Sequence, residues 1–409
     1  MTDKSVPTKD EFWQAMKEMV NQMIKERMES LMKLERQAFL EEERDYNKAN
    51  GYYQRNLHTQ YGKLQDLEVP RDREGNFSTA LFRPYGRRSG WLERTVINMY
   101  SKGMSTRKIA KLLEDMYGHY YSSSTVSRIT DLAMEEVEKF SNRSLKTRYS
   151  VLFLDAMALS LRRQTVQTEM VYFVAGIDET GYREILTFRV GGKESSNVWG
   201  EVLTDIKRRG AREILLVVTD NLAGIKDRIN RAYPRADYQK CVVHKVRNAK
   251  NKIRKKHETD LLRDLKRVYN APKRSQAREC FRDFKGKWED LYPQVVKSWE
   301  EDLSHLLTFL DYPDEIRQTI YTTNWLERAI KEVRRRTKTQ ESLPSLKAAQ
   351  KVLYLRTKDI NDSWKKQRMS GFKQAKPKLE EMFSDRYGPK EGSKEREKRV
   401  KDTPINLPG

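Results

Sequence analysis

The fold is decided by two short apolar runs that each end in an aspartate, Val151-Leu-Phe-Leu-Asp155 and Ile214-Leu-Leu-Val-Val-Thr-Asp220. Runs of four to eight apolar residues are typical of buried core strands. Residues 169–177 and 183–190 form two further runs, joined by the turn Asp178-Glu-Thr-Gly181, which predicts a hairpin. Residues 151–190 therefore predict a three-stranded meander.

The elements that follow the meander complete a sheet. An amphipathic helix is expected over residues 196–209, the strand at 214–218 follows, and then come a helix from 222 to about 232 and a fifth strand at 238–243. Three strands, helix, strand, helix, strand is the order of a ribonuclease-H-like domain, a mixed α/β sheet with helices on both faces.

Asp155 and Asp220 are predicted to end neighbouring strands, where open sheets bind ligands. Two adjacent carboxylates repel each other, and a divalent cation would remove that repulsion. Mg²⁺ or Mn²⁺ prefers carboxylate and phosphate oxygens, and a pair of ions can hold both oxygens of a phosphodiester displacement. The alternative is that both aspartates are ordinary turn and helix-capping residues.

A third carboxylate would be needed to hold two ions, and the helix expected after residue 324 offers Glu327 and Glu332. They lie about 140° apart on a helix, so both cannot face the sheet. Periodicity does not choose between them.

Cys241-Val-Val-His244 supplies only half of a zinc site, and the second cysteine, Cys280, has no partner at a usual spacing. We expect Cys241 and His244 to support the nearby site instead. Two cysteines in 409 residues also exclude a disulfide scaffold.

Charge points to a polyanionic partner, and double-stranded DNA is the expected one. The chain has 81 Lys and Arg against 59 Asp and Glu, a formal charge of +22. Residues 245–287 hold 16 basic and 5 acidic residues, about half of that excess. The basic residues at the start of this segment are candidate phosphate contacts, against the alternative of a solvated helix surface: Lys245, Arg247, Lys250, Lys252, Arg254, Lys255 and Lys256.

Residues 1–50 predict a helix from Glu11 to about Asn47 with a methionine-rich apolar stripe, either packed on the chain itself or used for homodimerisation. Residues 51–90 predict a basic extended hairpin that turns at Glu74-Gly75-Asn76. Its candidate DNA contacts are Arg71, Arg73, Arg87 and Arg88.

Residues 91–145 predict three helices with a turn at Lys102-Gly103-Met104 and a serine run before the third, the pattern of a DNA-binding helix-turn-helix. Ser105 is expected to cap the second helix. Ser123, Ser127 and Arg128 lie near the end of the third helix that would enter a major groove.

The whole chain predicts a multidomain α+β protein. A catalytic domain over 146–244 and 322–360 is interrupted by an all-helical insertion at 245–321 and followed by a helical or disordered tail at 361–409. No apolar run is long enough for a membrane helix, and the amino terminus has no secretion signal, so we expect a cytoplasmic protein.

Several ordered motifs resemble those of the bacterial Mutator-like insertion-sequence transposases (insertion sequence 256 family, DDE type). They include Leu152-Phe-Leu-Asp155-Ala, Val217-Val-Thr-Asp220, Gln239-Lys-Cys241-Val-Val-His244-Lys-Val-Arg247-Asn248, Thr322-Thr-Asn324-Trp-Leu-Glu327 and the basic run Arg334-Arg-Arg336. The resemblance covers residues 148–357, and the basic hairpin and helix-turn-helix also look like the family.

The resemblance implies that Asp155, Asp220 and Glu327 are catalytic and hold two Mg²⁺ or Mn²⁺ ions, that Cys241 and His244 lie beside them, and that the protein cuts and joins DNA at terminal inverted repeats. It implies a homodimer in a bacterial cell, associated with the nucleoid. We expect Asn324 and Trp325 to support the site and Arg334, Arg335 and Arg336 to contact DNA. Trp325 stands where the family often has a smaller residue, and it either stacks on a distorted base or packs its helix.

Two other classes stay open on the residues alone. One is a DNA-binding regulator with an inactive domain of this fold, and the presence of all three acids argues against it. The other is a nuclease that cuts without joining.

Overall fold

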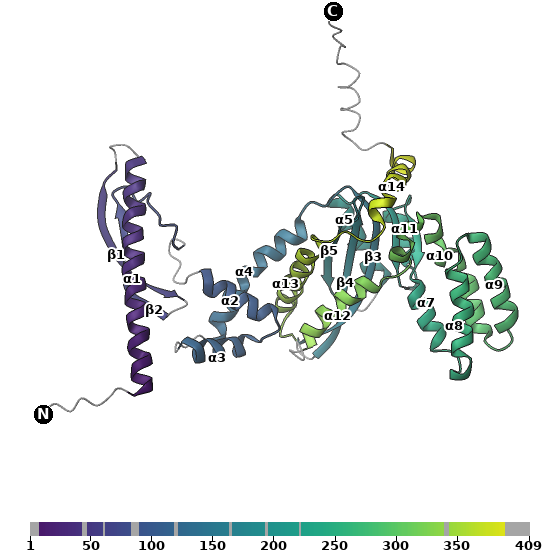
Figure 1. Cartoon of the computed structure of the whole chain (residues 1–409), viewed down its shortest axis with the longest axis horizontal. Helices are drawn as coiled ribbons and strands as arrows, with labels where there is room; N and C mark the ends of the chain where they lie inside the picture. Colours follow the sequence, from purple (N-terminus) through teal and green to yellow (C-terminus); the bar gives the residue numbers. More distant parts are fainter. Residues whose placement is uncertain are drawn as a thin grey trace, which may run out of the picture. The chain divides into compact units, whose positions relative to one another are not determined.

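A computed structural model describes residues 8–42, 47–59, 62–82, 90–117, 122–162, 166–192, 195–220, 222–338 and 343–388. The chain forms two compact units, Met1–Glu135 and Glu136–Gly409, and we describe each by itself (Figure 1). None of the described helices is both long and apolar enough to cross a membrane.

The first unit begins with a long helix packed on a two-stranded sheet. Helix α1 spans Lys9–Glu42, and strands β1 (Ala49–Thr59) and β2 (Gly62–Asp72) pair antiparallel. Met32 is fully buried among apolar side chains of this sheet and the segment after it, Leu57, Leu67, Val69 and Phe82. Part of the helix thus packs on the chain itself, one of the two alternatives left open.

The predicted position of the hairpin turn is wrong. The two strands meet between Thr59 and Gly62, and the bend at residues 73–75 follows β2 instead of joining two strands. Strand β1 has no apolar run or regular alternation that would mark it, since Tyr52-Tyr-Gln-Arg55 places two aromatic residues before two polar ones. The helix was expected to continue to Asn47, which lies outside α1 and whose side chain donates to Asp72 (2.7 Å).

Three helices follow, as predicted: α2 (Gly90–Ser101), α3 (Thr106–Tyr117) and α4 (Ser123–Asn142). Ser105 Oγ accepts from the backbone N–H of Lys108 at 3.3 Å, which confirms its capping role. Ser122 does the same for α4 through the N–H of Thr125 (3.1 Å). Buried Val96, Ile109 and Val126 form the apolar sides of these helices.

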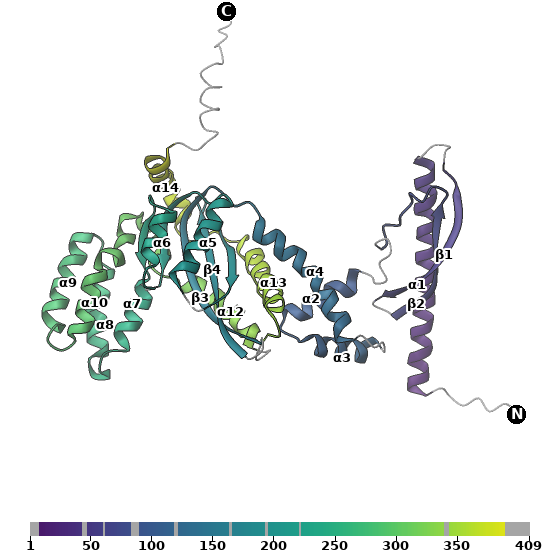
Figure 2. The ribbon, with the colours of Figure 1, turned by 180° about the vertical axis from the view of Figure 1, so that it is seen from behind.

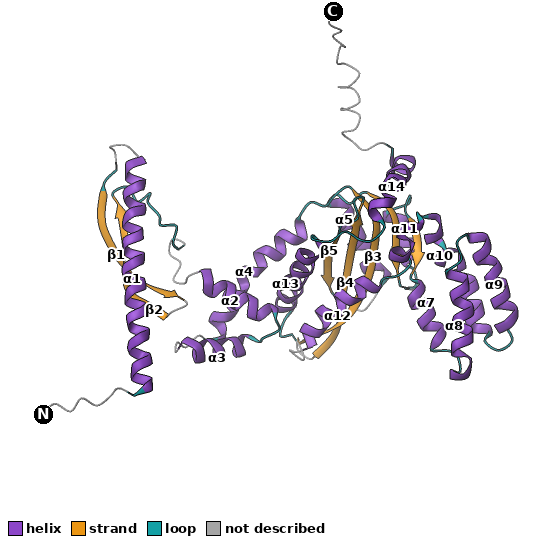
Figure 3. Cartoon of the chain, in the orientation of Figure 1, coloured by secondary structure: helices purple, strands orange, loops and turns teal. Residues whose placement is uncertain are grey.

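The second unit is built on a five-stranded mixed sheet (Figure 3). Its strands are β3 (Arg148–Arg162), β4 (Val166–Asp178), β5 (Arg183–Val190), β6 (Glu213–Thr219) and β7 (Asp237–Lys240), in the order β5-β4-β3-β6-β7. The first three form an antiparallel meander, β6 runs parallel to β3, and β7 runs parallel to β6. The predicted meander and the neighbouring positions of the first and fourth strands are confirmed.

Asp155 does not end its strand, which corrects the expectation. Strand β3 continues to Arg162, and Asp155 is paired with Phe173 of β4. The parallel pairing of β3 with β6 does stop one residue earlier, at Leu154 and Thr219. Asp155 therefore lies where the two strands separate. The last strand is also shorter than expected, because β7 ends at Lys240 and a helix begins at Val242.

Helices cover both faces of the sheet (Figures 1 and 2). Helices α5 (Ser196–Arg208) and α6 (Ile225–Ala232) bury Trp199, Leu203 and Ile229 against Leu152, Leu154 and their neighbours on one face. Because side chains alternate along a strand, the residues of β3 between these point to the opposite face of the sheet. There Phe153 meets Trp325 of α12 (Asn324–Lys338), and α13 (Leu346–Trp364) packs along β5.

The carboxyl-terminal part is helical in most of its described residues, which is one of the two alternatives predicted for residues 361–409. The catalytic domain was expected to end at residue 360, but α13 continues to Trp364, and α14 (Phe372–Tyr387) follows it. The Tyr387 hydroxyl donates to the backbone carbonyl of Ile214 in β6 (2.7 Å), and Phe372 and Phe383 are fully buried. Residues 389–409 lie outside the described part of the chain.

The segment predicted as an all-helical insertion contains only helices and turns in its described residues. It begins within α7 (Val242–Lys250) and continues with α8 (Lys255–Tyr269), α9 (Arg274–Trp288), α10 (Pro293–Leu306), the short 3-10 helix η1 (Thr308–Asp311) and α11 (Asp314–Ile320). Aromatic side chains such as Phe281, Phe284 and Trp299 fill its interior.

Candidate active site

Two adjacent strands position the first two candidate carboxylates. Asp155 and Asp220 both line a cavity of about 70 Å³ where β3 and β6 separate, together with Thr219 and the apolar side chains of Leu154, Trp199 and Ile225. A space of this size can hold a water molecule or a small ion. The two aspartates that the sequence singled out are thus brought to one cavity.

Negative charge accumulates around Asp155. Burial and the nearby charge of Asp220 raise the pKa of the Asp155 carboxyl to about 7, with a smaller contribution from Glu327. The Ala156 N–H, which donates to Asp155 Oδ1 at 2.7 Å, and His244 oppose the shift without cancelling it. A carboxyl so placed ionises more readily when a cation is close to it.

His244 lies between the other two acids. Its Nδ1 is in ion-pair contact with Asp220 Oδ1, and its Nε2 is 3.4 Å from Glu327 Oε1. Burial lowers the pKa of His244, but contacts with Asp220 and Cys241 outweigh burial and raise it to about 10. The imidazolium form therefore bridges the two carboxylates.

Glu327 is held by several neighbours on the first turn of α12. Arg247 Nη1 donates to Glu327 Oε2 at 2.8 Å, and Thr323 Oγ1 donates to Oε1 at 3.2 Å. Arg247 Nη2 also reaches Asn324 Oδ1, at 3.3 Å. Burial would raise the pKa of Glu327, but Arg247 and His244 lower it below its ordinary value. Glu332 instead pairs with Arg335 on the exposed side of the same helix, so of these two glutamates it is Glu327 that lies beside His244.

Cys241 supports the arrangement from the amino end of α7. It is the buried N-cap residue of that helix, and its Sγ lies 3.4 Å from Thr323 Oγ1, the hydroxyl that donates to Glu327. Donor atoms of Asp220, Cys241 and His244 lie within 4.8 Å of one another. The spacing Cys241-Val-Val-His244 thus places both side chains beside the acids.

Trp325 is half-buried and packs against other aromatic side chains. Its ring meets Phe153 edge-on (4.8 Å between centroids) and Trp364 (5.2 Å), and the Arg183 guanidinium lies over it at 5.6 Å. These contacts favour the helix-packing alternative over stacking on a base. Trp364 and Arg183, which complete the cluster, carried no signal in the sequence because they lie far from Trp325 along the chain.

The candidate DNA contacts are placed unevenly. Lys245 is buried, and its Nζ donates to Ser298 Oγ (2.7 Å) and Asp302 Oδ2 (2.5 Å), so its charge is used inside the protein. Lys250 pairs with Glu258. Exposed basic side chains gather at the turn between α7 and α8 and at the amino end of α8: Lys252, Arg254, Lys255 and Lys256.

The remaining candidates lie on other elements. Arg71 and Arg73 are exposed, at the end of β2 and just after it. On α4, Arg128 is exposed while Ser123 and Ser127 are half-buried. Arg335 is exposed on α12, and Arg334 and Arg336 are half-buried. Arg87 and Arg88 lie outside the described residues.

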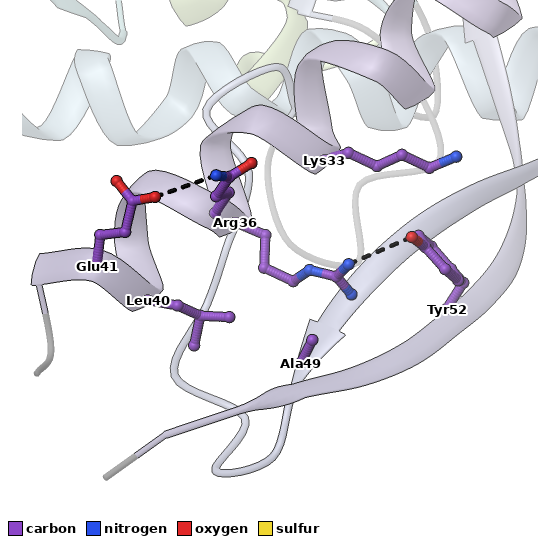
Figure 4. Close-up of a pocket in the computed structure, with 7 residues that line it drawn as sticks. Lys33, Arg36, Leu40, Glu41, Ala49 and Tyr52 are labelled. Carbon is purple, nitrogen blue, oxygen red and sulfur yellow. Dashed lines mark hydrogen bonds between the residues drawn. The ribbon is translucent and has the colours of Figure 1, made fainter. Parts of the chain in front are cut away.

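The first unit also carries a groove that sequence reasoning missed (Figure 4). It has a volume of about 660 Å³ and lies between α1 and β1, lined by Lys33, Arg36, Leu40, Tyr52 and neighbouring residues. Arg36 Nη2 donates to the Tyr52 hydroxyl (3.2 Å). The Lys33 ammonium and the Arg36 guanidinium both lie over the Tyr52 ring. Because β1 was not predicted, nothing indicated that these residues would meet.

The donor set suits a divalent cation. Oxygen ligands from Asp155, Asp220 and Glu327 are of the type that Mg²⁺ and Mn²⁺ prefer. Burial and the charge of Asp220 raise the pKa of Asp155, so a cation close to this carboxyl would stabilise its ionised form. The residues present therefore fit such an ion.

Comparison with known proteins identifies the family. A sequence profile described as "Transposase, Mutator family" matches residues 2–367. The chain belongs to the Mutator family of transposases. As a Mutator-family transposase it is an enzyme of DNA cleavage and strand transfer.

Relatives of this transposase come from several bacteria. The transposase for insertion sequence element IS905 of Lactococcus lactis is 37% identical over 82% of this chain and 86% of its own length. The transposase for ISRM5 of Rhizobium meliloti is 35% identical over 77% and 79%, and that for IS256 in transposon Tn4001 of Staphylococcus aureus is 29% identical over 77% and 81%. The match to the solved structure described as "Drosophila P element transposase strand transfer complex" covers 78% of this chain and 89% of the other, at 12% identity and with a TM-score of 0.29.

Proposed function

We propose that this transposase binds the terminal inverted repeats of its insertion sequence and cuts and joins DNA at a ribonuclease-H-like site formed by Asp155, Asp220 and Glu327. The observation that carries the proposal is the meeting of Asp155 and Asp220 at one cavity while His244 links Asp220 to Glu327. Strand order β5-β4-β3-β6-β7 supports the fold assignment.

The three carboxylates would hold two Mg²⁺ or Mn²⁺ ions. Bound ions of this kind activate water or a 3′-hydroxyl and stabilise the charge that develops on a phosphodiester under in-line attack. Asp155 on β3, Asp220 directly after β6 and Glu327 on α12 would supply the oxygen ligands. Thr323 and Asn324 orient the first turn of that helix through their contacts with Glu327 and Arg247.

Basic surfaces would hold the DNA. The proposed contacts are the helix-turn-helix of α2–α4, the exposed Arg71 and Arg73 at the end of β2 and just after it, and the exposed cluster of Lys252, Arg254, Lys255 and Lys256. Phosphate contacts of this kind give affinity that falls steeply with salt. We further propose a homodimer, because two element ends must be brought together, acting at the bacterial nucleoid in the cytoplasm.

The test compares the wild-type chain with Asp155→Asn on a labelled duplex that carries one element end, with Mg²⁺ and a target plasmid. We expect nicking and joined product from the wild type and a loss of at least about 10³-fold in the variant, since such groups act as a unit in transition-state stabilisation. Glu332→Gln, on the same helix as Glu327 but paired with Arg335, should keep activity.

Other results would identify other functions. Nicking without joined product would favour a nuclease. Tight, salt-sensitive binding without cleavage by either protein would favour a DNA-binding regulator. Equal activity of wild type and Asp155→Asn would exclude the proposed triad.

A further inference from the structure

Arg247 occupies an unusual position for a residue expected to contact DNA. Its Nη1 lies 2.8 Å from Glu327 Oε2 and 3.4 Å from His244 Nε2, and its Nη2 lies 3.3 Å from Asn324 Oδ1. Its side chain nevertheless stays 47% exposed, whereas that of Glu327 is only 11% exposed. The guanidinium thus neutralises a largely buried carboxylate from the solvent side.

From this arrangement we propose that Arg247 is an exchangeable counter-ion of Glu327, which pairs with the carboxylate in the DNA-free enzyme and transfers to a DNA phosphate when substrate binds. The proposal rests on the proposed function, since it takes Glu327 as a ligand of the divalent ion and DNA as the substrate. It adds a coupling between DNA binding and metal binding.

The contacts of Glu327 support an exchange. Thr323 holds Oε1, so the removal of Arg247 from Oε2 leaves the carboxylate oriented and frees one oxygen. A guanidinium at 2.8 Å competes with a divalent cation for the same oxygen and repels it. The long, flexible and half-exposed arginine side chain can leave this position, and arginine binds phosphate and carboxylate through the same planar donors.

The place of Arg247 in the fold supports a link to DNA. It lies on α7, and the exposed cluster Lys252, Arg254, Lys255 and Lys256 begins two residues after that helix ends. A DNA backbone bound at this cluster would bring phosphates near the same end of the insertion. Without DNA, Arg247 and His244 together offset the charges of Glu327 and Asp220, and the enzyme does not bind metal tightly.

The experiment measures Mn²⁺ binding to the full-length, DNA-free protein by isothermal titration calorimetry. We expect Arg247→Gln to bind Mn²⁺ about tenfold more tightly than the wild type, because a positive charge next to one ligand is lost. The matched control is Arg328→Gln, the same substitution at an exposed position next to Glu327 in the sequence, which should stay within about twofold of wild type.

A second measurement tests the other half of the exchange. In Ca²⁺, binding of Arg247→Gln to the element-end duplex should be weaker than that of the wild type, and the slope of log affinity against log salt should fall by about 1. Arg328→Gln should not change that slope.

The outcomes separate the two proposals. Unchanged or weaker Mn²⁺ binding by Arg247→Gln would overturn the exchange, and so would an unchanged salt slope. If Asp155→Asn binds Mn²⁺ as well as the wild type does, the proposed metal site itself is wrong, whatever Arg247 does.

Discussion

Gly181 shows how a single backbone position connects the meander to the carboxyl-terminal helix. It closes the turn between β4 and β5 with a φ of +88°, and its carbonyl accepts from the N–H of Met369 (2.9 Å). A Cβ built on Gly181 would clash with the Cβ of Phe372, the fully buried first residue of α14. Both the turn and the close approach therefore require glycine.

We predict that Gly181→Ala lowers the free energy of unfolding by about 2–4 kcal/mol, through the left-handed backbone and the clash with Phe372. Gly286 in α9 provides the control, since a Cβ added there would meet nothing within 4 Å and its backbone is helical. Gly286→Ala should leave stability unchanged or raise it by up to about 1 kcal/mol. Urea denaturation of both variants measures these changes in the free energy of unfolding. Equal midpoints for the two variants would contradict the prediction.

At the scale of elements, β3 shows what the sequence could and could not predict. Apolar runs located all five strands, and the order of elements predicted their neighbours. The charged Asp155 was taken as a strand end, although the alternation of buried and exposed positions continues through Met157, Leu159 and Leu161. A strand that carries the proposed catalytic carboxylate in its middle breaks the pattern at the position where the proposed function requires it.

The three acids of the proposed site were predicted from two different kinds of evidence. Asp155 and Asp220 follow from strand logic, whereas Glu327 was chosen only by the resemblance of Thr322-Thr-Asn324-Trp-Leu-Glu327 to the family motif. The pairing of Arg247 with Glu327 spans 80 positions along the chain. No local pattern carries such a contact, because it depends on how α7 and α12 pack.

Asp302 connects helix α10 of the predicted insertion to the sheet and to α7. From α10 it accepts from Lys240 Nζ of β7 and Lys245 Nζ of α7, each at 2.5 Å, and its side chain is 14% exposed. Burial would raise the pKa of Asp302, but the two lysines lower it below its ordinary value. For Lys245, burial is the stronger effect: it lowers the pKa of the ammonium group, although the contact with Asp302 raises it. The lysine thus depends on this carboxylate to stay charged.

We predict that Asp302→Asn destabilises the protein by about 3 kcal/mol at pH 7, because it leaves the buried Lys245 ammonium without its partner charge. Since the pKa of Asp302 is lowered by folding, its contribution is complete above the unfolded value of about 4 and is lost as the pH falls through the folded value. Urea midpoints at several pH values test this. The control Asp314→Asn, in an exposed pair with Arg317, should change little, and a gap between Asp302→Asn and wild type that widened at low pH would contradict the argument.

At the scale of the whole molecule, α1 leaves an apolar stripe uncovered. Phe12, Met16, Met19 and Met23 recur at steps of four and three residues, and Met19 is 66% and Met23 56% exposed. Met32, which packs on the hairpin, lies about 180° around the helix from Met23. The stripe therefore does not face the sheet, and its spacing is that of a helix–helix seam. This supports α1 as the dimerisation element.

We predict that the double substitution Met19→Glu and Met23→Glu converts a dimer of the full-length protein to monomer, because two charges would be buried in an apolar seam. Light scattering during size-exclusion chromatography measures the mass, and circular dichroism checks that the helix persists. Leu291→Glu is the control, since Leu291 is 58% exposed at a site outside α1 and should keep the wild-type mass. A double variant that remains dimeric would assign the interface to another surface. A monomeric but folded variant that still binds a single element end would show that α1 serves the pairing of ends, separately from the recognition of each.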